Sequence, residues 1–544
     1  MVFTEIKERN KKKYYYRVKS IRKGEKINKK RIYLGANLSK LELEKAEKEA
    51  DKEILPNKIP IKKSRTITLG IDKEKDFSEW FTKIIQKAEL ADIRYNVKGF
   101  LVFQPWSVLS MEKIYKFLEK KLQEKNHKPY WFPTLIPEKN FKIEEEHVKG
   151  FTPEVFWVTQ GGDTKFEEKL ALRPTSETAF YQMFSLWIRS YKDLPYKTYQ
   201  RANVFRYETK ATRPFLRSRE FHWIEGHCAH RTLKDAEAQV KEDMKTTEEI
   251  LGDVCLLPFI FFERPSWDKF PGAYRTFAAD VLNPDGKLVQ QPSTHILNQN
   301  FAKGFNVKFK DKDEKEKFAW ITCYGPAVSR IFASIIIVHG DDKGLKFPWK
   351  IAPKQIVIVP ISLEKKIIDK ARELKQILEK NNIDTTIDLD EEKRPGEKFY
   401  FWEMKGVPLR IELGKKEFQN KELTIYRRDT DEKEKIKENK LLDYIEKTSQ
   451  EYDKNLKKGA DYLFKNKIQN VEKKEDLKKI IDQGKIARCE FCSVDKEGKE
   501  CAEVVEKQIQ AQVRGIKLKK ETAKGKCVIC DKKAEEIVYI AREY

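Results

Sequence analysis

The 544-residue chain lacks the features that mark exported, membrane-spanning and P-loop proteins. Its longest apolar runs, such as IFASIIIV at residues 331–338, are far shorter than the about 20 apolar residues that span a bilayer. The charged start, MVFTEIKERNKKKYYYR, contains no apolar stretch of the kind found in a secretory signal. Neither a GxxxxGK(S/T) loop nor a strand–GxGxxG–helix fingerprint is present, so P-loop ATP chemistry is not supported. We therefore expect a soluble, cytoplasmic protein with no membrane partner.

The chain has a large excess of positive charge. Its 111 lysines and arginines outnumber 87 aspartates and glutamates, which gives a net charge of +24. Such an excess favours an anionic partner, most often nucleic acid, although a lysine-rich solvated surface is the alternative. Residues 1–65 hold 21 basic against 9 acidic side chains, so half of the excess lies in an eighth of the chain. That uneven distribution argues against a surface that is merely rich in lysine.

Residues 1–65 have the pattern of a small appended module. Two β-rich runs flank a KGEKINKK turn, and a charged helix follows with Ser39 as its N-cap. Residues 56–65 are rich in proline and lysine, which predicts a linker.

The rest of the chain changes character twice. From about residue 70 to 345 helices mix with strands, and antiparallel strand signals dominate after residue 198. Residues 354–445 alternate short apolar strands with helices, which predicts an α/β module with a parallel or mixed sheet. Residues 446–544 begin with a lysine-rich helix and end in clustered cysteines.

One arginine-rich hairpin is the strongest candidate site. The stretch RYETKATRPFLRSREFHWIEGH, residues 206–227, reads as two strands joined by a loop, and it carries Arg206, Arg213, Arg217 and Arg219. Arginine forms planar, two-pronged contacts with phosphate and carboxylate, so this group suits a polyphosphate. Phe221 offers a stacking face for an adenine ring. The alternative is a surface hairpin with charge pairs such as Arg206–Glu208.

The cysteines indicate a metal site near the C-terminus. Five of the eight cysteines cluster there, at Cys489, Cys492, Cys501, Cys527 and Cys530. In a large cytosolic protein, clustered cysteines indicate metal rather than disulfides, and paired thiolates suit a structural zinc ion. The spacing offers five cysteines for four positions, and Cys489 competes with Cys492 for one of them.

Five segments in order resemble the archaeal/eukaryotic type of prolyl-tRNA synthetase, a family of class II aminoacyl-tRNA synthetases. Residues 99–138 (GFLVFQPWSVLSMEKIYKFLEKKLQEKNHKPYWFPTLIPE) resemble motif 1, residues 205–230 (FRYETKATRPFLRSREFHWIEGHCAH) motif 2, and residues 325–353 (GPAVSRIFASIIIVHGDDKGLKFPWKIAP) motif 3. LALRPTSET (170–178) resembles the loop that holds proline, and QQPSTHILNQNF (290–301) resembles the substrate-contacting segment between motifs 2 and 3.

The resemblance implies an α+β multidomain fold and its boundaries. The basic N-terminal appendage at 1–65 would be followed by a class II catalytic core with an antiparallel sheet (66–350). An α/β anticodon-binding domain (351–450) and an α/β zinc-binding C-terminal domain (451–544) would complete the chain. Class II architecture further implies a homodimer formed through motif 1.

The resemblance also implies the activity. The chain would attach proline to tRNA(Pro) in an ATP-dependent reaction that passes through prolyl-adenylate. Catalysis would rest mainly on alignment and charge stabilisation. A threonyl relative is disfavoured because its substrate pocket needs a zinc site, and residues 68–345 lack a convincing Cys/His set. The remaining alternative is a catalytically silent, RNA-binding paralogue.

The positions of this chain that match the family's motifs give the implied site residues. Arg206 would bridge the amino-acid carboxylate and the α-phosphate, and Arg330 would contact the γ-phosphate; these two are the implied catalytic residues. The other implied ATP contacts are Glu208 near the adenine amino group, Arg217 or Arg219 at the terminal phosphates, Phe221, Gln290 and Ser293. The implied proline pocket comprises Thr175, Glu177, Arg206, His295, Cys323 and Gly325, with His295 as a structural histidine in the alternative reading.

The resemblance implies ligands for two metal ions, zinc and Mg²⁺. For zinc, the family form favours Cys492, Cys501, Cys527 and Cys530. For Mg²⁺, many relatives carry a glutamate just before the DG turn that helps to hold the ion; the nearest acid before that turn in this chain is Asp280, which is therefore the candidate Mg²⁺ ligand.

Three further regions have candidate roles. Lys398, Glu403, Lys405 and Arg410 are candidates for reading anticodon bases, or else structural residues of their strands and helix. Tyr544 matches a terminal tyrosine that would return toward the active site. Residues 1–65 fall outside the resemblance; they would bind tRNA phosphates in a salt-sensitive manner or merely extend the fold.

Overall fold

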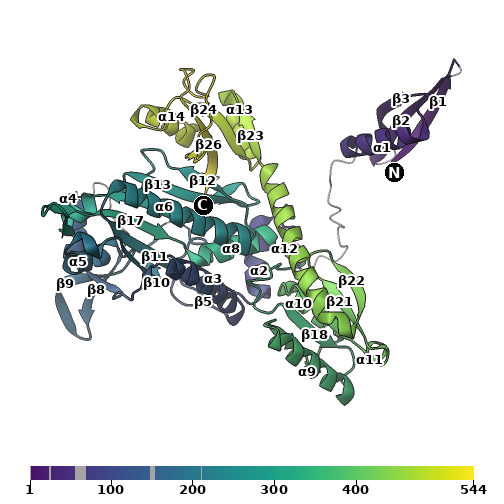
Figure 1. The fold of residues 1–544 in the computed structure, drawn as a ribbon, viewed down its shortest axis with the longest axis horizontal. Helices are drawn as coiled ribbons and strands as arrows, with labels where there is room; N and C mark the ends of the chain where they lie inside the picture. The colour runs from purple at the N-terminus through teal and green to yellow at the C-terminus, as the bar shows by residue number, and fades with distance from the viewer. Residues whose placement is uncertain (1, 11, 24–25, 55–68, 148–153, 210) are drawn as a thin grey trace. The chain divides into compact units, whose positions relative to one another are not determined.

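The computed structural model describes the chain apart from residues 1, 11, 24–25, 55–68, 148–153 and 210 (Figure 1). It divides into two compact units, Met1–Thr66 and Ile67–Tyr544. The predicted linker at 56–65 and the first predicted domain boundary lie outside the described residues.

The first unit is a three-stranded antiparallel sheet followed by one helix. Strands β1 (Val2–Arg9), β2 (Lys12–Lys23) and β3 (Lys26–Ala36) pair in the order β1-β2-β3. The helix α1 (Lys40–Ile54) begins after Ser39, whose backbone N–H and hydroxyl both bond Glu42, at 2.9 and 2.6 Å. The sequence predicted β2, β3 and this cap, but it did not predict β1.

The second unit is built on an eleven-stranded sheet. Its central strands are antiparallel neighbours in the order β12 (Ile260–Glu263), β13 (Arg275–Leu282), β14 (Lys287–Asn298), β17 (Trp320–Gly325), β11 (Glu220–His230) and β10 (Tyr196–Phe205). The short β6 (Lys128–Pro129) ends the sheet beside β10. These pairings confirm the antiparallel character predicted for this region.

The same sheet continues into the C-terminal region. Strand β25 (Gln512–Lys517) pairs with β12, and β26 (Glu536–Glu543), β24 (Ile486–Phe491) and β23 (Ile468–Val471) follow it in order. The end of β26 also pairs with the start of β14. Helices α13 (Lys474–Asp482) and α14 (Lys499–Val504) pack within this region. The C-terminal strands are therefore joined directly to the catalytic sheet.

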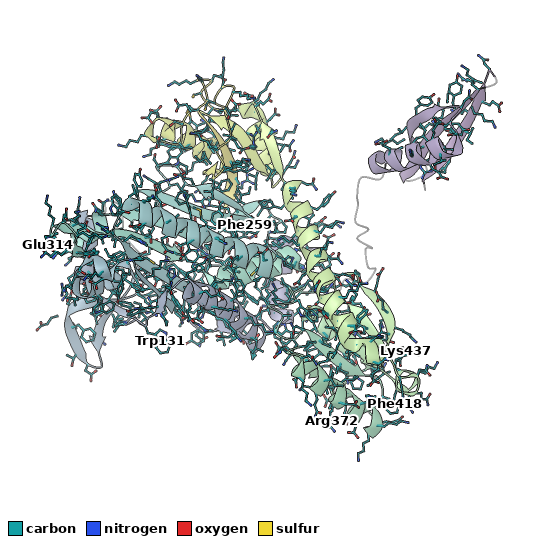
Figure 2. The ribbon with its side chains drawn as sticks, viewed as in Figure 1. Trp131, Phe259, Glu314, Arg372, Phe418 and Lys437 are labelled. Atoms are coloured by element: carbon teal, nitrogen blue, oxygen red, sulfur yellow. The ribbon has the colours of Figure 1, made fainter. Side chains whose placement is uncertain are left out.

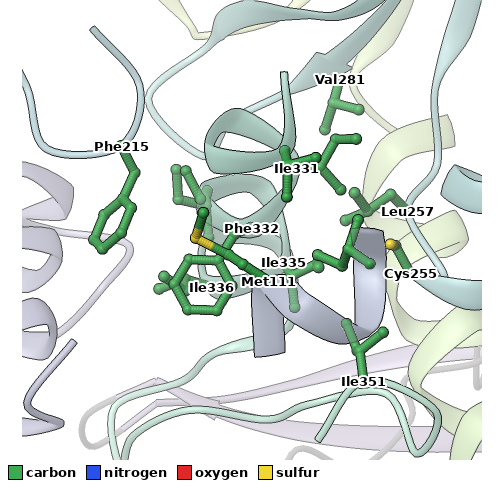
Figure 3. Packing of buried hydrophobic residues seen from close by; sticks show 14 of the residues in the cluster. Met111, Phe215, Cys255, Leu257, Val281, Ile331, Phe332, Ile335, Ile336 and Ile351 are labelled. Atoms are coloured by element: carbon green, nitrogen blue, oxygen red, sulfur yellow. The ribbon is translucent and has the colours of Figure 1, made fainter. Parts of the chain in front are cut away.

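Helices cover one face of the central strands (Figure 1). Helices α6 (Leu233–Glu248) and α8 (Val328–His339) contact these strands, and α3 (Pro105–Glu124) and α2 (Phe77–Lys87) join the same layer of apolar packing. Helix α8 is apolar almost all round, because it lies between the sheet and α3. Its Ile331, Phe332, Ile335 and Ile336 form the centre of the largest apolar core, with Met111 of α3 packed beside them (Figure 3).

Shorter elements bring loops to the other face. A small sheet of β7 (Leu135–Pro137), β9 (Thr164–Leu172) and β8 (Phe156–Gly161) precedes helix α5 (Glu177–Trp187). The remaining elements of this part are β4 (Ala91–Asp92), β5 (Val102–Phe103), α4 (Glu138–His147), α7 (Asn300–Gly304), β15 (Lys308–Lys310) and β16 (Glu316–Phe318). Among the described helices, none is long and apolar enough to cross a membrane.

The α/β module has a mixed sheet of order β19-β18-β20-β21-β22. Strands β19 (Thr385–Ile387), β18 (Ile356–Pro360) and β20 (Leu409–Leu413) are parallel, and β21 (Glu422–Arg427) and β22 (Glu432–Lys437) add antiparallel pairings. Its helices are α9 (Lys365–Lys380), α10 (Pro395–Met404) and α11 (Lys415–Asn420). The long helix α12 (Leu441–Lys465) then crosses residue 450, where the sequence predicted a domain boundary that stays a prediction.

The four candidate base-reading residues of this module are buried structural groups. Arg410 forms ion pairs with Glu403 at 3.0 Å and with Glu412 at 2.9 Å, and Lys398 lies 3.6 Å from Asp388. Lys405 donates to the carbonyl of Ala88 at 2.8 Å, which fastens the module to the catalytic core. Buried charges need such partners, so these side chains are not free to read bases, and this correction favours the structural alternative.

Candidate active site

A cavity of about 250 Å³ opens on the face of the central sheet that the helices leave free. Ten of the residues predicted for the site line it: Thr175, Glu177, Arg206, Phe221, Gln290, Ser293, His295, Cys323, Gly325 and Arg330. They come from the β9–α5 loop, the start of α5, the loop that follows β10, the strands β11, β14 and β17, and helix α8. The sheet therefore brings together side chains from 175 to 330 in one cavity.

One end of the cavity is acidic. Glu177 begins helix α5, and Thr175 just before it bonds both Glu177 and Glu225. Glu225 also accepts the backbone N–H of Ser176 at 2.9 Å. Burial raises the pKa of Glu177. For Glu225, burial acts in the same direction, but hydrogen bonds from His227, Ser176 and Gln200 outweigh it and leave the pKa lowered. The pocket thus holds a buried carboxylate suited to a cationic group.

Sequence reasoning missed several lining residues of β11, among them Trp223, Glu225 and His227. They alternate with the buried Ile224 of the helix-covered face, since successive side chains of a strand point to opposite faces. Because Phe221 was already assigned to the site, every second residue after it on the same strand could have been predicted to line the cavity. His227 accepts or donates a 3.0 Å hydrogen bond with the hydroxyl of Tyr181.

The other end of the cavity is strongly basic. The guanidinium groups of Arg206 and Arg330 lie 5.1 and 5.9 Å from the ring centre of Phe221. Burial and the positive charges of Arg206 and Arg217 lower the pKa of Arg330 to about 10, and burial also lowers the pKa of Arg206. Like charges are held together here at an electrostatic cost, as expected where an anion binds between them.

Arg217 and Arg219 of the motif 2 loop have different surroundings. Arg217 lies 3.9 Å from Glu208, a pair next to the cavity but not among its lining residues. Arg219 donates to the backbone carbonyl of Glu208 at 3.1 Å and lies over the ring of Tyr207, whereas the charge of Arg217 acts on Arg330 in the cavity. Of the two candidates for the terminal phosphates, the geometry favours Arg217.

Arg213 and Tyr544 meet at the back of the same loop. The guanidinium of Arg213 lies 5.2 Å from the ring centres of both Phe77 and Phe81 and 5.5 Å from that of Tyr544. Arg217 donates to the carbonyl oxygen of Tyr544 at 2.9 Å. Tyr544 therefore returns to the motif 2 loop, as the resemblance implied, and Arg213 packs against aromatic rings there.

Strands β14 and β17 form the floor. His295 bonds Thr276 through Nδ1 and Ser293 through Nε2, both at 3.0 Å, so it is a fixed structural histidine that also lines the cavity. Burial lowers its pKa to about 3, which keeps the ring neutral. A Cβ at Gly325 would lie 3.3 Å from Trp223, so the glycine allows this ring to pack closely.

Asp280 is not placed as a metal ligand. Its carboxylate is fully buried and accepts hydrogen bonds from Arg264 at 2.7 and 3.0 Å and from Arg514 at 2.9 Å. Arg264 also donates to Gln290 at 3.0 Å. The guanidinium groups of two arginines bind both oxygens of this carboxylate. The expected Mg²⁺ contact at Asp280 is therefore wrong.

The C-terminal region brings four cysteines together. The sulfur atoms of Cys492, Cys501, Cys527 and Cys530 all lie within 4.8 Å of one another. Cys489 is buried on β24 outside this group, which resolves the ambiguity between it and Cys492. Glu177, Glu225 and His227 also bring ligand atoms within 4.8 Å of one another, at the acidic end of the cavity.

Comparisons with known proteins agree with this geometry. Residues 156–339 match the tRNA synthetase class II core domain (G, H, P, S and T), and residues 355–448 match the anticodon binding domain. Residues 474–544 match the C-terminal domain of prolyl-tRNA synthetase. The antiparallel sheet with its basic and acidic cavity thus defines a class II aminoacyl-tRNA synthetase.

Relatives narrow the class to one family. Proline–tRNA ligase of Thermofilum pendens is 45% identical over 482 residues, which cover 88% of this chain and 99% of the relative. Prolyl-tRNA synthetase of Giardia lamblia in complex with prolyl-adenylate superposes with a TM-score of 0.84 at 34% identity, over 88% of this chain and 100% of that one. The Cryptosporidium parvum enzyme complexed with halofuginone and AMPPNP gives 0.83 at 32% identity, over 88% and 97%. The chain belongs to the archaeal/eukaryotic type of prolyl-tRNA synthetase and is a proline–tRNA ligase.

Proposed function

We propose that the cavity joins proline to ATP and that each end binds one reactant. The acidic end, with Glu177 and Glu225, receives the ring ammonium of proline, because a buried carboxylate favours a cation there. The basic end, with Arg206 and Arg330, receives the phosphates. The separation of acidic and basic ends within one cavity is the observation that carries this proposal.

Arg206 lies where the two reactants meet. Its side chain is positioned by a 3.2 Å hydrogen bond from Nε to the carbonyl oxygen of Pro174, next to the proline loop. We assign it to the proline carboxylate and the α-phosphate, where it neutralises charge as the carboxylate oxygen attacks phosphorus and pyrophosphate leaves. The carboxylate is itself the nucleophile, so the reaction requires no covalent enzyme intermediate. A hydroxyl of the 3′-terminal ribose of tRNA(Pro) then attacks the prolyl carbonyl of the adenylate, which forms the prolyl ester and releases AMP.

The remaining ATP contacts are assigned along the basic end. Phe221 stacks on adenine, Glu208 lies near its amino group, and Gln290 and Ser293 contact the nucleotide. Arg217 and Arg330 bind the terminal phosphates, with Arg330 at the γ-phosphate. Cys323 and Gly325 belong to the proline side with His295. Mg²⁺ enters with ATP as the counter-ion of the phosphates.

The four-cysteine cluster fits a structural zinc ion. In tetrahedral thiolate sites Zn–S bonds of about 2.3 Å separate the sulfurs by about 3.8 Å. The Sγ atoms of Cys492 and Cys501 are 3.7 Å apart, in agreement with that spacing. The zinc ion supplies folding energy when bound, and the cysteines hold β24 and α14 together.

The motif 1 segment supports a homodimer. Val108, Leu109, Trp131 and Leu135 of residues 99–138 are exposed apolar side chains, with Trp131 91% exposed. Large apolar side chains left exposed to this degree favour an interaction surface. We propose that a second copy of the chain covers it.

Amino-acid-dependent exchange of pyrophosphate into ATP tests the assignment. We expect exchange with proline, and its loss in Arg206→Ala with the thermal unfolding of the chain unchanged. Near-normal exchange in that variant would overturn the role given to Arg206. A chain that exchanges with no amino acid would support the silent, RNA-binding paralogue instead.

A further inference from the structure

The first unit carries three tyrosines on one face of its sheet. Opposed residues of paired strands share a face, and the register pairs Lys7 with Tyr14 and Tyr16 with Tyr33. The rings confirm this, because Tyr33 lies 5.3 Å from Tyr16 and 6.5 Å from Tyr14 between ring centres. Phe3 and Arg31 fall on the same face, since both pair with Val18. We call this the tyrosine face.

The helix packs on the opposite face. Thr4 of β1 pairs with Arg17 of β2. Each is next in sequence to residues of the tyrosine face, so both side chains lie on the opposite face of the sheet. Both bond Glu47 of α1, Arg17 at 3.4 Å. Within the described part of this unit, α1 therefore lies on the side of Thr4, whereas Lys7, Lys29, Arg31 and Tyr33 of the tyrosine face are exposed around the buried Val18 (Figure 2 draws the side chains of this unit).

Basic side chains are interleaved with the aromatic rings. The Nζ of Lys7 lies 5.8 Å from the ring centre of Tyr16, and that of Lys29 lies 6.0 Å from the ring centre of Phe3. Both lysines and Arg31 are exposed, as is Tyr33 at 54%. Among the described side chains of this face, the acid is Glu5, whose carboxylate pairs with Arg31 at 2.8 Å. Rings beside cations form a surface suited to phosphates and bases.

This unit equals in size the part of the chain that two relatives leave unmatched. The Thermofilum and Giardia proteins are matched over 99% and 100% of their own lengths, yet each covers only 88% of this chain. That share equals the fraction occupied by Ile67–Tyr544. The catalytic unit is thus full length without the first unit, which leaves the tyrosine face without a role in adenylate formation.

We propose that the tyrosine face is a second RNA-binding surface, which takes the tRNA that the catalytic unit charges. Lys7, Lys29 and Arg31 contact backbone phosphates, and Tyr33 stacks on an unpaired base or ribose. RNA is favoured because exposed rings among cations fit a base-bearing polyanion, and because the proposed function, on which this inference rests, supplies that ligand. Binding is strongest at low salt, since phosphate contacts release counterions.

Two double lysine variants provide a matched test in the full-length chain. Lys7→Glu/Lys29→Glu changes the tyrosine face. Lys30→Glu/Lys45→Glu makes the same change in net charge at exposed sites away from it, because Lys30 follows Lys29 on the opposite face and Lys45 lies on α1. Affinity for a tRNA transcript with a proline anticodon is measured by filter binding between about 50 and 200 mM salt.

We expect the tyrosine-face variant to bind the transcript about tenfold more weakly than the control and to reduce the salt slope by about 1.5, which corresponds to two lost phosphate contacts. Tyr33→Ser should weaken binding about fivefold or more, whereas Tyr33→Phe keeps the ring and the affinity. Proline-dependent pyrophosphate exchange involves no tRNA and should be unchanged in all variants.

Equal affinities of the two double variants would overturn the proposal, because the loss would then reflect net charge alone or no contact at all. Wild-type affinity in Tyr33→Ser would overturn the stacking contact. These outcomes are separable from a failure of the proposed function, which would abolish proline-dependent exchange in the unmodified chain whatever its affinity for tRNA.

Discussion

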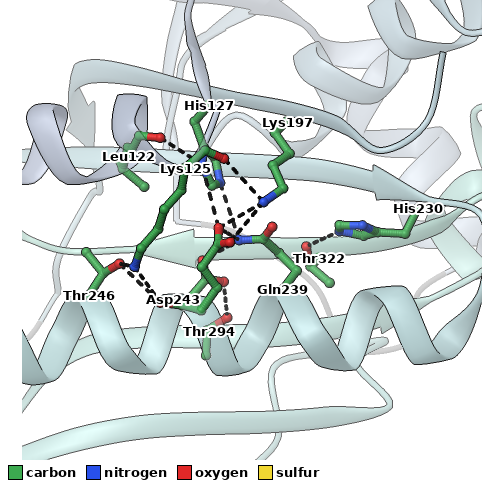
Figure 4. A network of polar contacts seen from close by, with 11 residues as sticks. Leu122, Lys125, His127, Lys197, His230, Gln239, Asp243, Thr246, Thr294 and Thr322 are labelled. Atoms are coloured by element: carbon green, nitrogen blue, oxygen red, sulfur yellow. Dashed lines mark hydrogen bonds and ion pairs between the residues drawn. The ribbon is translucent and has the colours of Figure 1, made fainter.

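Asp243 of helix α6 is a carboxylate buried among neutral hydrogen-bond donors (Figure 4). It accepts from Thr294 of β14 and from the amide of Gln239, each at 2.8 Å. Burial raises its pKa to about 7. Because the folded chain then binds a proton that the unfolded chain has released, the stability contributed at this position falls as pH rises from about 4 to about 7.

We therefore predict that Asp243→Asn raises the free energy of unfolding at pH 8 by about 2 kcal/mol and has little effect near pH 4. Asparagine keeps an acceptor for Thr294, and its amide can donate to Oε1 of Gln239, which has no partner among the described atoms. Urea unfolding at several pH values measures the difference. Asp253→Asn, at an exposed aspartate, is the control. A gain that does not vary with pH would contradict the assignment.

The cysteine cluster gives a second prediction for single residues. Cys492→Ser should lower the zinc content of the purified chain well below one ion, because it removes one of four thiolate ligands. Cys489→Ser is the matched control, since Cys489 is buried nearby on β24 but stands outside the cluster. Zinc is measured by elemental analysis. Equal metal contents in the two variants would argue against a site of these four cysteines.

Residue types and spacing predicted part of the cavity well. Arg206, Phe221 and Arg330 lie in segments that the motifs identify, and the structure brings them together. Glu225 was missed because the alternation of side chains along β11, which places it on the same face as Phe221, was not used. The candidates of the anticodon module failed for a related reason, because burial of Arg410 and Lys405 depends on partners distant in sequence.

At the scale of elements, one chain of contacts joins the C-terminal strands to the cavity. Arg514 of β25 bonds Asp280 of β13, Asp280 bonds Arg264, and Arg264 bonds Gln290 in the cavity wall. The sequence predicted the strands of each region, but not that β25 pairs with β12 and continues the catalytic sheet. Pairing between strands about 250 residues apart leaves no trace in local periodicity.

Arg514→Met tests whether this contact positions the ATP wall. Removal of one buried partner leaves Asp280 with less compensating charge, so we predict a loss of about 3 kcal/mol in stability. We also expect the KM for ATP in proline-dependent exchange to rise about tenfold while the KM for proline changes little. Arg542→Met, in which an exposed pair with Asp482 is lost, is the control. A uniform fall in kcat without a change in either KM would indicate a purely structural role.

At the scale of the whole molecule, the proposed homodimer rests on the exposed apolar side chains of residues 99–138. Trp131 projects from the surface of the catalytic unit (Figure 2), and buried tryptophans contribute strongly to interfaces. We predict that the chain has about twice its mass of 64.4 kDa by size exclusion with light scattering. Trp131→Lys should shift the mass toward that of a single chain, because a buried lysine without a partner is unfavourable. Tyr462→Lys, at an exposed aromatic of α12, should leave the mass unchanged. An unmodified chain that elutes as a monomer at micromolar concentration would contradict the predicted dimer. A dimer whose mass does not change in Trp131→Lys would place the interface on another surface.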